Sequence, residues 1–422
     1  MRHRIATVII GLCLCCTSST VSASEEVFEG KTMGPVPYRV VLNILPAGET
    51  RDTMAAAIAE ELESVNRRMS TYQPDSEVSQ FNRATTIDWQ PVSVETAQVV
   101  QRAIELSRAS DGAFDITVAP LVNLWSFGPD GAPEELPSDE AIQQALANVG
   151  YTALDVRLDP PALRKSKPQL TIDLSAIAKG FAVDQVARRL EQLGAADYLV
   201  EVGGEVRTLG HNPRDRDWML GIEEPIPAMR VADYSVPLSG KSLATSGDYR
   251  NFFVVDGQTY SHTIDPAQGR PVSHSMHSVS VIADDCMTAD AWATALMVLG
   301  PDQVQPYAKK ANIEVFWITS KLGDDNSRTF AHNWTDGFPL ANDGELAGRQ
   351  AGGSLWTMFA AALIVFVVAL MGMAIGVIVS NRQIKGSCGG LAALRRGDEK
   401  SPCEVCQSRS TCDEYQKATQ DS

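Results

Sequence analysis

Two oxygen-bearing side chains stand one helical turn apart in the stretch DDCMTADAWATALMVLG. Asp290 and Thr294 are four residues apart, a spacing that brings both side chains to one face of a helix. A carboxylate and a hydroxyl are hard oxygen ligands, which Mg²⁺ accepts while water or phosphate oxygens fill its other positions. The pair also fits a structural role, because the helix dipole favours an acid in the first turn and threonine can bond to a carbonyl. The spacing alone favours the structural role.

A cation and a glycine follow one another in the segment DLSAIAKG, where an expected strand turns into an expected helix. Lys179 could pair with a phosphate at this turn, and the amides of the helix start would add to the attraction. Alternatively, Asp173 or Ser175 caps the helix and Lys179 faces solvent, which is the better interpretation of one short motif. The segment does not have the spacing of a P-loop.

Other candidates for chemistry lie in loop-like segments. Gly203 and Gly204 separate two expected strands, where they allow close approach to a ligand or only a hairpin turn. His262 in YSHTIDP is a candidate general base, although an isolated histidine is more often structural. Tyr72 offers an aromatic face for stacking or for packing. Further polar side chains of these loops are Ser246, Asp248, Tyr249 and Asp265.

The elements that must position these residues alternate between helices and hairpins without a regular strand–helix–strand rhythm. Hydrophobic periodicity predicts the following elements. We expect strands at 37–45 and 278–283, a hairpin at 197–210, helices at 54–69, 93–111 and 284–300, and a strand that turns into a helix within 170–194. This order favours an α+β fold with mixed or antiparallel sheets and packed helices.

Bulk composition excludes several classes of protein. The formal net charge is −16, which argues against nucleic-acid binding. Between the two ends of the chain, the single cysteine is Cys286, so a disulfide framework is excluded. The length between the two ends allows one large domain, or two closely packed domains, with a sizeable core.

The first residues resemble a targeting segment. Arg2 and Arg4 precede an apolar run, and small residues follow at the position where a signal peptidase cleaves. We expect a signal peptide at 1–23 and consider lipidation of the early cysteines the less favoured alternative.

A second apolar stretch, 355–379, is long enough to cross a hydrocarbon core of about 30 Å. Basic residues follow it, so we expect the preceding part outside and the tail in the cytoplasm. The expected layout is an exported domain at 24–335, a linker at 336–354, one transmembrane helix at 355–379 in the inner membrane, and a cytoplasmic tail at 380–422.

The tail carries four cysteines close together. They are Cys388, Cys403, Cys406 and Cys412. Because the cytoplasm keeps thiols reduced, such a cluster points to a metal, either zinc or iron. A redox-active C-x-x-C pair is the alternative.

Taken together and in order, several segments resemble the ApbE family of FAD:protein FMN transferases over about residues 33–335. They are MSTYQPDSEVSQFN, SDGAFDITVAPLVNLWSFGP, IDLSAIAKGFAVDQV, YLVEVGGEVRTLG, SGDYRNFF, YSHTIDPAQGRPV and TADAWATALMVLGP. The resemblance implies a single T-fold-related domain, with FAD as substrate and Mg²⁺ as cofactor. It also implies that an acceptor Thr or Ser hydroxyl attacks the FMN phosphorus and AMP leaves.

The resemblance also assigns roles to individual residues. It implies that Asp290, Thr294 and the carbonyl of Ala176 bind Mg²⁺, and that Lys179 lies at the pyrophosphate and His262 in the catalytic loop. These last two are the catalytic candidates. The cofactor-binding residues that it implies, besides Lys179 and His262, are Met33, Tyr72, Asp115, Glu205 and Asp248.

The segment 353–415, with its motif KGSCGGL, is similar to a second family, the NqrM factor that matures the sodium-pumping NADH:quinone reductase. That resemblance implies iron supply to a reductase that itself carries FMN on threonine. The expected partners are therefore flavin-acceptor subunits of a membrane redox complex.

Two other functions are compatible with the same residues. In a FAD pyrophosphatase, water replaces the protein hydroxyl, and Tyr72 is placed to influence that choice. In a non-catalytic factor, the chain binds flavin or delivers metal without chemistry.

Overall fold

The computed structural model describes residues 25–128, 136–226, 232–322 and 328–341, and an eight-stranded sheet lies at its centre. The strands, in spatial order, are β1 (Glu26–Thr32), β2 (Val36–Leu42), β6 (Tyr198–Val202), β7 (Glu205–Leu209), β10 (Ser242–Gly247), β15 (Met276–Ala283), β16 (Glu314–Leu322) and β17 (Arg328–Trp334). Every neighbouring pair is antiparallel.

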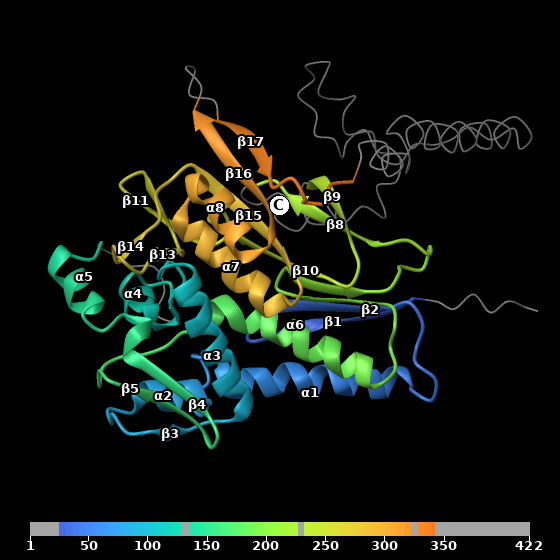
Figure 1. Ribbon diagram of the computed structural model, residues 1–422, viewed down its shortest axis with the longest axis horizontal. Helices are drawn as coiled ribbons and strands as arrows, with labels where there is room; N and C mark the ends of the chain where they lie inside the picture. Colours follow the sequence, from blue (N-terminus) through green and yellow to red (C-terminus); the bar gives the residue numbers. More distant parts are fainter. Residues whose placement is uncertain (1–24, 129–135, 227–231, 323–327, 342–422) are drawn as a thin grey trace, which may run out of the picture. The chain divides into compact units, whose positions relative to one another are not determined.

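Three long helices pack on this sheet and on one another (Figure 1). They are α1 (Arg51–Met69), α6 (Ser175–Gln192) and α7 (Cys286–Leu299). In α1, buried residues recur every three or four positions, as in Met54, Ile58, Leu62 and Val65, so one stripe faces the core. Thr50 starts this helix with a capping box.

Helix α7 is buried over most of its surface, because it contacts α6 on one side and strands β10 and β15 on the other. Its buried alanines, which leave room for both contacts, are Ala289, Ala291, Ala293 and Ala295. The helix begins after Asp285, whose carboxylate accepts a bond from the N–H of Thr288 at 2.7 Å.

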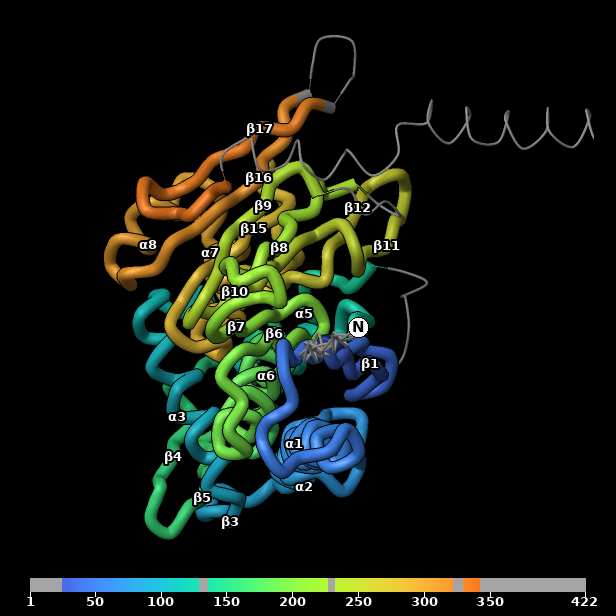
Figure 2. Tube along the Cα trace, turned by 90° about the vertical axis from the view of Figure 1, so that its right-hand side faces the viewer, coloured from blue at the N-terminus to red at the C-terminus, as the bar shows by residue number. Residues whose placement is uncertain are grey.

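The other helices and strands surround this core. The remaining helices are α2 (Glu77–Arg83), α3 (Val94–Ala109), α4 (Ala119–Leu124), α5 (Asp139–Leu146) and α8 (Val304–Ala311), with short 3₁₀ turns at Ile116–Val118, Tyr151–Ala153 and Pro301–Gln303. The remaining strands are β3 (Gln90–Pro91), β4 (Leu154–Leu158), β5 (Pro161–Lys165), β8 (Trp218–Glu223), β9 (Ala232–Leu238), β11 (Phe252–Val255), β12 (Gln258–Ser261), β13 (Ile264–Asp265) and β14 (Arg270–Pro271). Figure 2 shows the β11–β12 hairpin at the periphery of the domain.

The β8–β9 hairpin forms a second hydrophobic cluster with the sheet. Ile222 and Val236 of the hairpin are buried with Phe316 of β16. Phe338 joins the same cluster, and the N–H of Ala341 donates to a carbonyl of β9 at 2.9 Å. The folded domain therefore continues to Ala341, beyond the expected boundary at residue 335.

The predicted α+β class is confirmed, with an antiparallel main sheet. One local prediction is wrong, because residues 170–174 form no strand before α6 and Leu174 precedes the helix as its N-cap. Within the described residues, no helix has the length and apolar character needed to cross a membrane. The signal peptide, the transmembrane stretch 355–379 and the cysteine tail lie outside the described residues.

Candidate active site

A cleft of about 1350 Å³ lies where the start of α6, the middle of α7 and the ends of several strands of the main sheet come together. It is larger than most small-molecule pockets, which favours an extended ligand such as a dinucleotide. The predicted site residues that line it are Tyr72, Asp115, Ala176, Lys179, Glu205, His262, Asp290 and Thr294. Residues separated by more than two hundred positions in the sequence are thus brought to one cleft.

Asp290 is the most constrained of these side chains. It is only 3% exposed, and its Oδ2 accepts a hydrogen bond from the backbone N–H of Gly180 at 3.0 Å. Nζ of Lys179 lies 3.3 Å from Oδ1 and 3.4 Å from Oδ2 of the same carboxylate. Asp290 is the fifth residue of α7, not part of the helix cap, and Lys179 faces the carboxylate instead of solvent. Asp290 is therefore not explained as a helix cap, and Lys179 is not explained as a solvent-facing side chain. The capping role expected of Asp173 is seen, because its carboxylate accepts a hydrogen bond from the N–H of Ser175 at 2.8 Å.

Gly180 makes this arrangement possible. A Cβ atom at this position would lie 2.3 Å from the carbonyl oxygen of Cys286 and 2.8 Å from the Cα of Met287. The two helix backbones therefore touch at this point, and only glycine fits between them.

Hydroxyl groups complete an oxygen-rich region around Asp290. Oγ1 of Thr294 lies one turn further along α7 and 3.3 Å from Oγ of Ser246 in β10. Ala176 borders the same cleft from α6. A carboxylate, two hydroxyls and a backbone carbonyl are the donors that Mg²⁺ prefers, so these residues fit that ion. Within the described ranges, no group of three His, Cys, Asp or Glu side chains forms a metal cluster, and this donor set does not need one.

Glu205 adds a second buried carboxylate to the region. It is 4% exposed, its Oε1 lies 3.5 Å from Nζ of Lys179, and its Oε2 is buried without a hydrogen-bond partner. Burial raises the pKa of Glu205 to about 7, and the Lys179 ammonium opposes this only in part. Burial alone would lower the pKa of Lys179, but Asp290 and Glu205 outweigh it and raise that pKa, so the amine stays charged.

His262 follows β12 directly and borders the cleft. Its Nδ1 lies 3.1 Å from the carbonyl oxygen of Asn251. Because a carbonyl only accepts, Nδ1 carries the proton and Nε2 keeps a lone pair. Burial lowers the pKa of His262, and the hydrogen bond to Asn251 opposes this only in part. The neutral form of His262, the form that can act as a base, is therefore favoured.

The family resemblance implied that Asp248 binds the cofactor, but Asp248 is not among the residues that border the cleft. Its Oδ2 accepts from Nδ1 of His277 at 2.8 Å, and Nε2 of that ring lies 2.7 Å from Oγ of Ser320. The chain of contacts joins the turn after β10 to β15 and β16. Its neighbours Tyr249 and Asn251 do border the cleft, so Asp248 fixes the turn that presents them.

Residues 34–317 match the model of the ApbE family. The chain belongs to the ApbE family. Residues 377–422 match the model described as (Na+)-NQR maturation NqrM, so the predicted fusion of the two families is confirmed.

Named relatives agree with this assignment. A FAD:protein FMN transferase of Haemophilus influenzae is 41% identical over 293 residues, which cover 68% of this chain and 85% of the relative. A FAD:protein FMN transferase of Vibrio cholerae is 40% identical over 309 residues, 73% of this chain and 91% of the relative. The solved structure of the flavin transferase ApbE from Vibrio cholerae aligns with a TM-score of 0.67 at 39% identity, over 75% of this chain and 98% of that structure.

Three cofactor-binding positions implied by the ApbE resemblance lie in different settings. Tyr72 borders the cleft and is 67% exposed. Asp115 also borders it, but its carboxylate accepts bonds from the N–H and hydroxyl of Thr117 and from the N–H of Tyr151, and burial raises its pKa. Met33 packs against the core in the turn between β1 and β2, outside the residues that line the cleft.

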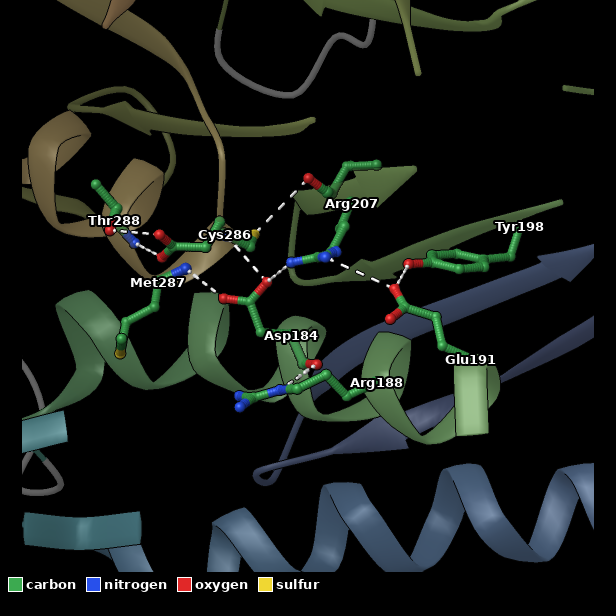
Figure 3. Close-up of polar contacts among 10 residues, drawn as sticks. Asp184, Arg188, Glu191, Tyr198, Arg207, Cys286, Met287 and Thr288 are labelled. Carbon is green, nitrogen blue, oxygen red and sulfur yellow. Dashed lines mark hydrogen bonds and ion pairs between the residues drawn. The ribbon is translucent and has the colours of Figure 1, made fainter. Parts of the chain in front are cut away.

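A buried acid that no sequence motif pointed to holds α7 against α6 (Figure 3). The carboxylate of Asp184, in α6, accepts from the N–H groups of Cys286 at 3.1 Å and Met287 at 3.0 Å. Arg207 of β7 donates to the same carboxylate at 2.9 Å and balances its charge. An acid in the middle of an otherwise apolar helix face was the available signal, since such a group needs a buried partner. These bonds fix the start of α7, the helix that carries Asp290.

Proposed function

We propose that this chain transfers the FMN part of FAD to a Ser or Thr hydroxyl of an acceptor protein and releases AMP. The observation that carries the proposal is the meeting of Asp290, Thr294 and Lys179 at one oxygen-rich end of a dinucleotide-sized cleft. The names and activities of its relatives in the ApbE family support the same reaction.

The covalent step is a substitution at phosphorus. The acceptor oxygen forms a bond to the phosphorus of the FMN half, and the bond from that phosphorus to the bridging oxygen breaks. That oxygen leaves as part of AMP. In this proposal Nε2 of His262 accepts the proton of the acceptor hydroxyl, since Nδ1 bonds to the carbonyl of Asn251.

The cleft residues contribute charge and position. The ammonium of Lys179 offsets the negative charge of the pyrophosphate, which otherwise repels an oxygen nucleophile. Asp290, Thr294 and the carbonyl of Ala176 are the residues that would hold Mg²⁺. When bound, this ion neutralises phosphate charge and stabilises the departing AMP.

The test separates this reaction from its two alternatives. The purified full-length chain is incubated with FAD, Mg²⁺ and a candidate acceptor, such as a subunit of the sodium-pumping NADH:quinone reductase. An increase in acceptor mass equal to one FMN supports the transfer. Free FMN and AMP with unlabelled acceptor would instead indicate a FAD pyrophosphatase, and unchanged FAD would indicate a binding or delivery factor.

We further propose that the chain is a single-pass inner-membrane protein with its flavin domain outside and its cysteine tail inside. The NqrM match at 377–422 and the apolar stretch 355–379 support this arrangement. In the tail, Cys388, Cys403, Cys406 and Cys412 are the proposed ligands of iron or zinc. Replacing Cys403 and Cys406 by Ser should reduce the metal bound per chain and spare flavin transfer. Unchanged metal content in that variant would rule out a thiolate site.

A further inference from the structure

The hairpin of β11 and β12 is fixed to the domain by one face. On this inner face, the rings of Phe253 and Tyr260 stack at 5.4 Å. Phe253 also stacks on Phe127 at 5.1 Å, and Tyr260 on the buried Trp125 at 5.7 Å. Trp125 is fixed in turn, because its Nε1 donates to a backbone carbonyl at 2.8 Å. The inner face of the hairpin is therefore held to the domain by an aromatic stack.

Its outer face carries two uncovered apolar side chains. Because side chains alternate along a strand, Phe252 and Val254 face away from the stack. They are 38% and 55% exposed. Their partners across the hairpin have small side chains: Thr259 opposite Val254 is exposed, and Ser261 opposite Phe252, at the end next to the cleft, is buried. The other exposed large apolar side chains of the described residues, apart from Tyr72 in the cleft, lie on separate elements or loops. These are Ile44, Ile87, Val94, Leu136, Leu158 and Trp334.

Both ends of the hairpin lead directly into the cleft. Asn251 precedes β11, His262 follows β12, and both line the cleft. The N–H of His262 donates to the carbonyl of Asn251 at 3.1 Å, so the two strands stay paired up to the cleft rim. With a rise of about 3.3 Å per residue, Val254 lies about 10 Å from that rim.

We propose that Phe252 and Val254 bind the acceptor protein at the segment that flanks its reactive hydroxyl. This inference rests on the proposed function. A hydroxyl that reaches His262 is part of a polypeptide, and that polypeptide must cross the rim of the cleft on its way in and out. An extended segment of about three residues spans the distance from His262 to Val254. The partner is therefore an extended peptide with apolar side chains close to its Ser or Thr.

The test measures recognition of the acceptor separately from recognition of FAD. The double variant Phe252→Ser, Val254→Ser is compared with Ile87→Ser, a control whose parent side chain is 56% exposed, close to the 55% of Val254. In the double variant, we expect the KM for the acceptor to rise about tenfold, the size of loss typical of interface anchors. The KM for FAD and the kcat at saturating acceptor should stay within about twofold, as should all three constants in the control.

Each other outcome contradicts the inference. An unchanged KM for the acceptor would show that the apolar pair does not bind it. An equal rise in the KM for FAD would assign the hairpin to the flavin subsite. Retained FAD binding shows that the variant is folded. If the unmodified chain labels no acceptor, the proposed function itself fails and this inference fails with it, so the two failures are distinguishable.

Discussion

The backbone N–H of Gly180 donates a hydrogen bond to Oδ2 of Asp290 at 3.0 Å, which joins α6 to α7 at their closest approach. The contact exists because glycine leaves room for the carbonyl of Cys286, 2.3 Å from where a Cβ would stand. The position of the Asp290 carboxylate is thus set by a backbone N–H group and does not depend on the conformation of another side chain. This geometry underlies the first two predictions.

Gly180→Ala should destabilise the domain and lower transfer activity. In an open helix, alanine would stabilise by about 1 kcal/mol, but here its methyl must push the two backbones apart at a cost of about 2 kcal/mol or more. Urea unfolding followed by circular dichroism measures the free energy. Gly48→Ala is the control, because nothing lies within 4 Å of the added methyl and only the strain of its φ of +88° remains. Greater stability of Gly180→Ala than of the parent would refute the close contact.

Asp290→Asn should lower kcat/KM for flavin transfer about 10²- to 10³-fold with little change in fold. The substitution removes the negative charge that balances Lys179 and would attract Mg²⁺, and it conserves side-chain volume. Transfer is measured as FMN mass on the acceptor over a range of Mg²⁺ concentrations. Asp302→Asn, at an exposed position just after α7, should leave activity unchanged. Full activity of Asp290→Asn would contradict its assignment as a ligand.

The pH dependence of kcat/KM should reflect His262. A general base must be neutral, and burial lowers the pKa of this ring from 6.5, so activity should fall only below pH 6.5. Because the pKa of Glu205 is raised to about 7, the profile is also measured in Glu205→Gln, which removes that titration. His262→Gln should lower kcat about 10²-fold or more and abolish the acidic limb. An unchanged acidic limb in His262→Gln would assign the base elsewhere.

Asp248 and His277 should act as one unit, because the carboxylate and the imidazole are 2.8 Å apart. If Asp248 only fixes the turn before β11, Asp248→Asn and His277→Asn should lower kcat by the same factor, and the double variant should be no worse than either. If Asp248 contacts the flavin directly, Asp248→Asn alone should raise the KM for FAD. The three variants, measured side by side, decide between these roles.

The sequence predicted most elements that carry the site, since their periodicity and caps are local properties. Residues 54–69, 93–111 and 284–300 are helical with small changes at their ends, and 197–210 is a hairpin. The strand expected before α6 is absent. Residues 170–174 read as a strand because apolar and polar residues alternate, but the buried Leu170, Ile172 and Leu174 pack in an irregular segment. Long-range packing, not local preference, decides such a segment.

The site was predictable only as a set of residues, not as a geometry. Spacing suggested that Asp290 and Thr294 share a face, but no local pattern shows that Lys179, more than one hundred positions earlier, points at Asp290. The pairing of Asp248 with His277 was missed for the same reason, since it joins the turn after β10 to strand β15. The approach of α6 to α7 at Gly180 left only a faint signal, a glycine within a helix.

The carboxylate of Asp184 in α6 accepts hydrogen bonds from the first turn of α7, so this turn is completed only when α7 packs on α6. Helices α6 and α7, which both border the cleft, consequently form this side of it only once they pack together, although the residues in contact are about a hundred positions apart in the sequence. A dinucleotide that binds only when the two helices are packed together shifts the folding equilibrium toward that native state by mass action. Substrate binding and the stability of the fold are thereby coupled, and the melting temperature should rise with the concentration of FAD.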